Sequence, residues 1–306
     1  MHPLRGILLK LISVLLFSIM AACIKAASDH VPPGEAVFFR SIFAMPVIFG
    51  WLAMRGEMRT GLKTDNVMGH FWRGVIGTTA MALGFSALGL LPLPEVTAIS
   101  YAAPLLVVVF AAMFLGEQVR LFRLSAVGLG LIGVMIILYP RLSAFNGPER
   151  DAIAALGAII TLGSATFMAL AQIHIRKLVQ TEKTAAVVFY FTLSSTLLSL
   201  LTIPFGWVLP NTTEFLLLAV AGLLGGTAQI FLTSAYRFAP ASVVAPFDYA
   251  SMLFALLIGY FVFLESPTIP MLLGAAIIIA SGILIIWRER QLGLKRGARK
   301  AITPQG

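Results

Sequence analysis

An internal repeat is the feature that most constrains how this chain can fold. Residues 74–137 and 222–285 align without gaps at an offset of 148. Identical pairs at that offset include Gly74/Gly222, Gly77/Gly225, Thr79/Thr227, Pro92/Pro240, Tyr101/Tyr249 and Glu117/Glu265. Each copy holds about three hydrophobic stretches of bilayer-crossing length. If an odd number of spans separates equivalent helices, the two copies must have opposite orientations in the membrane.

The composition is that of an all-α integral membrane protein. The chain is 59% hydrophobic and 11% charged, with a mean hydropathy of +0.94, so its polar residues could not cover an aqueous surface. At roughly 20 apolar residues per crossing, 306 residues can supply ten transmembrane helices. The pattern predicts these at about 7–27, 34–54, 70–90, 95–115, 122–139, 153–173, 184–204, 214–235, 241–263 and 270–287.

The basic residues predict the orientation. If the N-terminus is cytoplasmic, 18 of the 22 Lys and Arg residues fall at inner ends of spans, as the positive-inside rule requires. Both termini are then cytoplasmic, and five spans separate equivalent helices. We therefore expect a 5+5 inverted repeat, with a first repeat over 1–145, a second over 146–290 and a basic cytoplasmic tail over 291–306. The tail is interpreted as a topology anchor near anionic lipid, with no role in binding nucleic acid.

The sequence carries no pattern of an enzyme or a metal site. Cys23 is the single cysteine, and the four histidines lie at scattered positions without zinc-site spacing. We find no Walker motif, no nucleophile motif and no paired acids. Neither a cofactor nor a resident metal is expected.

Several motifs resemble the EamA family, the ten-helix branch of the drug/metabolite transporter superfamily. They are Leu115-Gly116-Glu117, its echo Phe263-Leu264-Glu265, the glycine-spaced segment Gly128/Gly130/Gly133, and the early pair of Lys25 and Arg40. The second copy departs from the pattern, with Leu264 where the motif prefers glycine. The resemblance implies a transporter in the bacterial inner membrane. Similar members export amino acids and related metabolites, and others import riboflavin or S-adenosylmethionine.

Charges inside a bilayer are costly unless they are paired or face water, so they are the first candidates for substrate contact. Asp248, seven residues into the ninth span, could bind a substrate amine, carry a proton, or bond backbone amides freed near Pro246. Arg40 could hold a substrate carboxylate in a bidentate pair. It could also extend to lipid headgroups, or form a fixed ion pair with Glu35 or Glu95.

Two tyrosines suggest a central cavity. Tyr101 and Tyr249 each follow the repeated proline by nine residues, so they could face one cavity if the fourth and ninth spans cross at a pseudo-two-fold axis. Ordinary helix packing is the alternative. The further substrate-binding candidates are Thr97, Ser100, Tyr190, Gln229 and Phe247.

We therefore expect a secondary transporter that moves a small organic metabolite by alternating access. Export of an amino acid or related zwitterion is the first prediction, since Arg40 and Asp248 would complement a carboxylate and an amine. The alternative is uptake of an aromatic vitamin or cofactor such as riboflavin or S-adenosylmethionine. A lipid scramblase or a receptor ranks lower, and the expected assembly is a monomer or weak homodimer.

Overall fold

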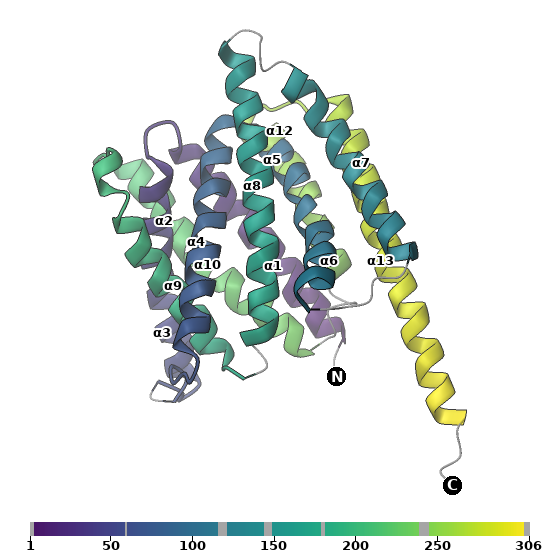
Figure 1. The fold of residues 1–306 in the computed structure, drawn as a ribbon. Coiled ribbons are helices and arrows are strands. Elements are labelled where there is room, and N and C mark those ends of the chain that lie inside the picture. Colours follow the sequence, from purple (N-terminus) through teal and green to yellow (C-terminus); the bar gives the residue numbers. More distant parts are fainter. Residues whose placement is uncertain are drawn as a thin grey trace.

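The computed structural model describes residues 3–58, 60–115, 121–143, 149–178, 181–238 and 245–302, and these residues form helices and loops without strands (Figure 1). Eight helices are long and apolar enough to cross a membrane, and two shorter apolar helices cover Thr184–Leu200 and Phe247–Phe263. The elements are α1 (Pro3–Ala27), α2 (Pro33–Ile42), α3 (Ala44–Met54), α4 (Val67–Leu90), α5 (Leu93–Ser100), α6 (Ala102–Leu115), α7 (Leu121–Ser143), α8 (Glu149–Leu178), α9 (Thr184–Leu200), the 3₁₀ turn η1 (Ile203–Phe205), α10 (Thr212–Phe238), the 3₁₀ turn η2 (Ala245–Tyr249), α12 (Ala250–Phe263) and α13 (Ile269–Ile302). Helical segments thus occupy all ten stretches expected from the sequence.

Three of the expected spans are interrupted. The second divides into α2 and α3 at Phe43, and the fourth divides into α5 and α6 at Tyr101. In each case a proline follows the break by three residues, Pro46 or Pro104. A proline cannot donate to the carbonyl four residues earlier, and its ring crowds that carbonyl, so the helix bends there. In the ninth span the 3₁₀ turn η2, which contains Pro246, precedes α12.

Local sequence explains two helix ends that matter for the site. Asn66 caps α4, because its side-chain oxygen accepts a hydrogen bond from the Gly69 N–H at 2.9 Å. The helix therefore starts at Val67, three residues earlier than expected. At the C-terminal end of α12, Leu264 adopts the left-handed conformation, with φ 57°, and the helix stops there. The Glu265 N–H donates to the Gly259 carbonyl at 2.9 Å. Glycine adopts that conformation without strain, which accounts for the motif's preference at this position.

Helices from the first and second halves of the chain pack against each other. α1 lies along α10, with the Ser13 hydroxyl bonded to the Ala228 carbonyl at 2.8 Å, and α2 packs against α9 and α10. α7 and α13 lie side by side, and the first turn of α1 and the last turn of α13 are at the same end of the molecule (Figure 1). An added Cβ at Gly133 of α7 would lie 2.8 Å from the Gly274 carbonyl oxygen of α13, so the close approach requires glycine.

Many large apolar side chains point away from the bundle. Phe205, Met54 and Leu209 are each more than 80% exposed. In water this would be unfavourable, but lipid is the expected neighbour of such a surface in a multi-pass membrane protein.

Candidate functional site

Four charged side chains form a cluster at the end of the bundle where α1 ends. Lys25 Nζ lies 3.0 Å from Glu265 Oε1 and also donates to the carbonyls of Leu88 and Leu91, at 3.0 and 2.8 Å. The second oxygen of Glu265 accepts the N–H of Leu93 at 2.9 Å. Glu265 therefore links the end of α1 to the start of α5.

Arg141 and Glu95 complete this terminal charge cluster (Lys25, Glu95, Arg141 and Glu265). The Arg141 guanidinium makes a bidentate pair with the Glu95 carboxylate, at 3.0 and 2.5 Å. Glu95 is almost fully buried, so the pair is protected from the screening that weakens surface ion pairs. Every charge in the cluster is neutralised within the protein.

A second ion pair joins α1 to the interrupted ninth span. Lys10 Nζ lies 2.6 Å from Asp248 Oδ1, and the Lys10 side chain is 3% exposed whereas that of Asp248 is 44% exposed. The 3₁₀ turn η2 places Asp248 on the side facing α1. Asp248 thus has a cationic partner in Lys10. The sequence interpretation counted Lys10 only as one of the basic residues at the inner ends of spans.

Tyr101 and Tyr249 lie together at the helix breaks. Their rings meet edge to face, with centroids 5.1 Å apart. The Ser251 hydroxyl donates to the Asp248 carbonyl at 2.7 Å and therefore accepts the Tyr101 hydroxyl, also at 2.7 Å. The Tyr249 ring hydroxyl lies against Gly282 of α13. Both hydroxyls are thus in contact with neighbouring helices.

The remaining candidates from the sequence are spread along the bundle. Thr97 donates to the Leu93 carbonyl of its own helix at 2.9 Å. Ser100 and Phe247 are half-buried near the tyrosine pair in sequence, and Gln229 lines a small cavity described below. The structure does not gather all nine candidates into one open pocket.

Arg40 is buried in α2, with 4% of its surface exposed, so it does not extend to the membrane surface. The two acids considered as fixed partners are bonded elsewhere. Glu35 accepts the Val208 N–H at 3.0 Å, and Glu95 pairs with Arg141. Arg40 Nε has no hydrogen-bond partner among the described residues.

Arg73 of α4 is a buried cation that the sequence interpretation missed. It was counted as a cytoplasmic charge, yet it is 6% exposed, and its guanidinium stacks on the Phe191 ring at 4.0 Å from the centroid. The Asn66 cap was the available signal, because an earlier helix start places Arg73 deeper in the bundle. With Gln229 and side chains of α8 and α9, Arg73 lines a cavity of about 30 Å³.

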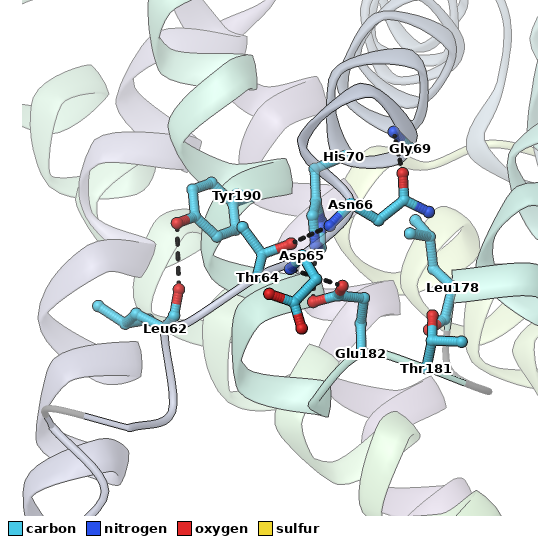
Figure 2. A network of polar contacts seen from close by, with 10 residues as sticks. All are labelled: Leu62, Thr64, Asp65, Asn66, Gly69, His70, Leu178, Thr181, Glu182 and Tyr190. Atoms are coloured by element: carbon cyan, nitrogen blue, oxygen red, sulfur yellow. Dashed lines mark hydrogen bonds and ion pairs between the residues drawn. The ribbon is translucent and has the colours of Figure 1, made fainter.

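A polar network lies at the N-terminal end of α4, opposite the end that contacts the terminal charge cluster (Figure 2). His70 Nε2 lies 3.3 Å from Glu182 Oε2, and both side chains are under 5% exposed. The Tyr190 hydroxyl donates to the Leu62 carbonyl at 3.0 Å, and its ring packs on His70. Tyr190 therefore belongs to this network rather than to the tyrosine pair.

The Glu182 carboxylate is the acceptor that holds the network together. Burial alone raises its pKa, but hydrogen bonds from Thr64, His70 and the Asp65 N–H outweigh burial and place the pKa below its usual value. The folded protein therefore favours the ionised carboxylate.

Some positions from the sequence analysis lie outside the described residues, namely Glu117, Pro240 and the segment around Asn146. In the described part of the chain, His, Cys, Asp and Glu nowhere gather in groups of three that could hold a metal ion. The described residues present buried charges, hydroxyls and aromatic rings between helices.

Comparisons with known proteins agree with this fold and composition. The model of the EamA-like transporter family matches residues 4–139 and 155–287. The chain is 31% identical over 285 residues to the pseudopaline exporter CntI of Pseudomonas aeruginosa, covering 92% of this chain and 93% of the relative. It is 32% identical over 295 residues to the riboflavin transporter of Vibrio cholerae, covering 95% and 96%.

Two more similarities are informative. The S-adenosylmethionine uptake transporter of Rickettsia prowazekii is 28% identical over 288 residues, with 94% of each chain covered. A protein of known crystal structure, 22% identical, superimposes with a TM-score of 0.66 and covers 94% of this chain and 98% of its own, so it shares the fold. With both halves matched by one family model and relatives named as transporters, the chain is a transporter of small molecules rather than an enzyme, and it is a member of the EamA-like transporter family.

Proposed function

We propose that this protein exports an amino acid or a related zwitterion by alternating access. The observation that supports the proposal best is the placement of buried charges of both signs along α1, α2 and η2. Arg40 is a buried guanidinium with an unused donor, and Asp248 is a half-exposed carboxylate held by Lys10. A substrate carboxylate would suit the first, and a substrate amine could compete with Lys10 for the second.

The proposed mechanism has two gates. The terminal charge cluster joins α1 to α5 through Glu265, and the His70–Glu182 contact joins α4 to the segment before α9. Each gate must part for its end of the bundle to open, while the middle of the bundle holds the substrate. Export is the preferred direction because the chain resembles the pseudopaline exporter over nearly its whole length.

We propose a 5+5 inverted repeat for this mechanism, with repeats over 1–145 and 146–290 and both termini cytoplasmic. Two features support it. The helix breaks at Tyr101 and Tyr249 occur at repeat-equivalent positions, and α1 and α13 have their terminal ends on the same side of the bundle. The bacterial inner membrane is the proposed location, and a monomer or weak homodimer is the proposed assembly.

Uptake of an aromatic cofactor is the second candidate. The edge-to-face tyrosine pair provides an aromatic wall, and relatives named for riboflavin and for S-adenosylmethionine uptake are similar over 94% or more of this chain. A flavin or adenine ring could stack where the two tyrosine rings now meet.

Counterflow in proteoliposomes separates the candidates. Vesicles loaded with unlabelled amino acids, riboflavin or S-adenosylmethionine would be diluted into traces of the labelled compound. We expect accumulation for an amino acid, lost in Asp248→Asn and Arg40→Gln but retained in Arg55→Gln, which removes an exposed surface cation. Accumulation of riboflavin alone would favour the second candidate. Lipid flipping without solute counterflow would indicate a scramblase and reject the proposal.

A further inference from the structure

Two arginines are buried in the bundle with no counter-ion among the described residues. Arg40 is 4% exposed and Arg73 is 6% exposed, and neither takes part in an ion pair among the described residues. Arg40 Nε and both Nε and Nη1 of Arg73 lack hydrogen-bond partners there. A buried charge without a partner costs several kcal/mol, so a fold that keeps two of them requires a reason.

Each of the two guanidinium groups lies against a glycine near the middle of a long helix. The Arg40 guanidinium packs on Gly225, where an added Cβ would be 2.9 Å from Nε. Gly225 is the fourteenth of 27 residues in α10. Arg73 folds towards Gly77, the eleventh of 24 residues in α4, whose added Cβ would overlap Nη1. α2 packs against both α4 and α10, and the two charges repel each other.

The repeat explains why each of these two glycines packs against an arginine side chain. Gly77 and Gly225 are equivalent at the offset of 148, and Arg40 is equivalent to Phe191 at the offset of 151 that aligns Phe38-Phe39 with Phe189-Tyr190. Phe191 packs on Gly77, 2.8 Å from its added Cβ, just as Arg40 packs on Gly225. Both glycines therefore provide room for a neighbour from the other repeat, and the guanidinium groups occupy that room.

One of the two groups borders a cavity. Arg73 and Gln229 line the space of about 30 Å³ between α4, α8, α9 and α10. Gln229 follows Gly225 by one helical turn, so it lies on the face of α10 that contacts Arg40. A cavity of this size holds about one water molecule, so this conformation is closed around Arg73.

We propose that Arg40 and Arg73 together bind a substrate with two carboxylate groups, namely an acidic amino acid. This rests on the proposed transport of a zwitterion and narrows its substrate class. A guanidinium presents paired N–H donors that match the geometry of a carboxylate. Two such groups need two negative charges, whereas a monocarboxylate would leave one arginine uncompensated.

The test uses isosteric ligands that differ in charge. Purified full-length protein in detergent is titrated with L-glutamate, L-glutamine, succinate and inorganic phosphate at constant ionic strength, and the melting temperature is recorded. A ligand that binds only the folded protein raises Tm. We expect glutamate and succinate to bind at least tenfold more tightly than glutamine. Arg40→Gln and Arg73→Gln should abolish this difference, and Arg73→Lys should retain part of it.

Two controls keep the result interpretable if a variant is unstable. Arg55→Gln removes a cation that is 40% exposed in a loop and should leave glutamate binding unchanged. Without ligand, Arg73→Gln should raise Tm by about 2–5 °C, because the cost of burying a charge with no acid among the described residues exceeds the attraction of the Phe191 ring. A structural arginine would give the opposite sign.

The proposal is overturned if glutamate and glutamine bind equally, if neither binds, if Arg73→Gln keeps the preference for glutamate, or if phosphate binds and no dicarboxylate does. Counterflow separates this failure from failure of the proposed function. Glutamine counterflow without any preference for glutamate would leave amino-acid transport intact and reject the dicarboxylate site. Arginine-dependent glutamate binding without counterflow would support the site and reject the transport.

Discussion

The charges at one end of the bundle and those in its middle are arranged in opposite ways. In the terminal charge cluster, Lys25 pairs with Glu265 and Arg141 pairs with Glu95, and backbone groups also bond Lys25 and Glu265. Beside the middle of α4 and α10, Arg40 and Arg73 are buried more deeply than the cations of the cluster, and no acid among the described residues pairs with either of them. A fully paired charge can be explained by stability alone, whereas an unpaired charge lowers stability.

The difference gives mutations opposite expected signs. Removing one member of a buried pair leaves the other charge unpaired and destabilises the protein. Removing an unpaired charge stabilises the protein, but it weakens the binding of the ligand that this charge contacts. The Lys10–Asp248 pair lies between these cases, because one member is buried and the other is half-exposed.

The largest effect is expected at Glu265. Glu265→Ala removes the partner of Lys25 and the acceptor of the Leu93 N–H, so it should cost about 3 kcal/mol and lower Tm by about 5–10 °C. Thermal unfolding in detergent measures this. Glu57→Ala is the control, because Glu57 forms an exposed pair at 3.9 Å that should contribute under about 0.5 kcal/mol. Equal losses in both variants would remove the distinction between the cluster and an ordinary surface pair.

Asp248→Asn should have an intermediate effect. The amide oxygen can still accept from Lys10, but the charge attraction is lost, so we expect a cost of about 1–2 kcal/mol. Lys10→Met added to Asp248→Asn should recover part of the loss, which a double-mutant cycle would measure. An unchanged Tm in Asp248→Asn, with transport abolished, would assign this carboxylate to the substrate rather than to the fold.

Leu264→Gly should stabilise the end of the bundle that contains the terminal charge cluster. Leu264 holds a left-handed conformation next to Glu265 while 86% of its surface is exposed. Glycine removes the steric cost and loses little burial, so Tm should rise by an amount equivalent to about 0.5–1 kcal/mol. Leu264→Ala is the matched control, because alanine keeps the steric cost; stabilisation by alanine too would refute the backbone explanation.

The smallest effect concerns pH and the network in Figure 2. The pKa of Glu182 is depressed in the folded protein, so its contribution to stability is complete above the ordinary carboxyl value of 4.5 and is lost as pH falls through the folded value below it. At pH 7 the free energy of unfolding of the wild type should exceed that of Glu182→Gln by about 0.5–1 kcal/mol, and the two values should converge near pH 3. Melting curves across that range test this, and a constant difference would show that the ionised form is not favoured.

Sequence patterns were sufficient for the helices and the family. Hydrophobic stretches separated by charged loops gave all ten helical regions, and the Leu-Gly-Glu type motifs pointed to the family that the comparisons show. The interruptions were only partly expected. Pro246 predicts freed backbone amides in the ninth span, whereas the breaks before Pro46 and Pro104 are not among the predictions. A proline three residues past a helix break is readable from sequence, and it was the neglected signal.

The partners of the buried charges were much harder to predict. Lys10 and Asp248 are 238 positions apart, so their contact depends on how α1 meets the ninth span. Glu95 was a candidate partner for Arg40, but the packing of α5 beside α7 gives it to Arg141. Propensity and periodicity fix which face of a helix is apolar, and they do not determine which polar groups meet across three helices.

The central position of the arginines also has an electrical consequence. A site half-way across the bundle divides the membrane potential into two portions, one on each side of the bound ligand. Each elementary charge that crosses 100 mV exchanges about 2.3 kcal/mol with the field. If the arginines stay near the middle of the bundle while one gate closes and the other opens, the substrate is the only charge that moves through the membrane. An acidic amino acid, with net charge −1, leaving a cell with a negative interior would then gain about 2.3 kcal/mol, equivalent to a concentration ratio of roughly 50. The voltage across the membrane, with no coupling ion, would be enough to drive export.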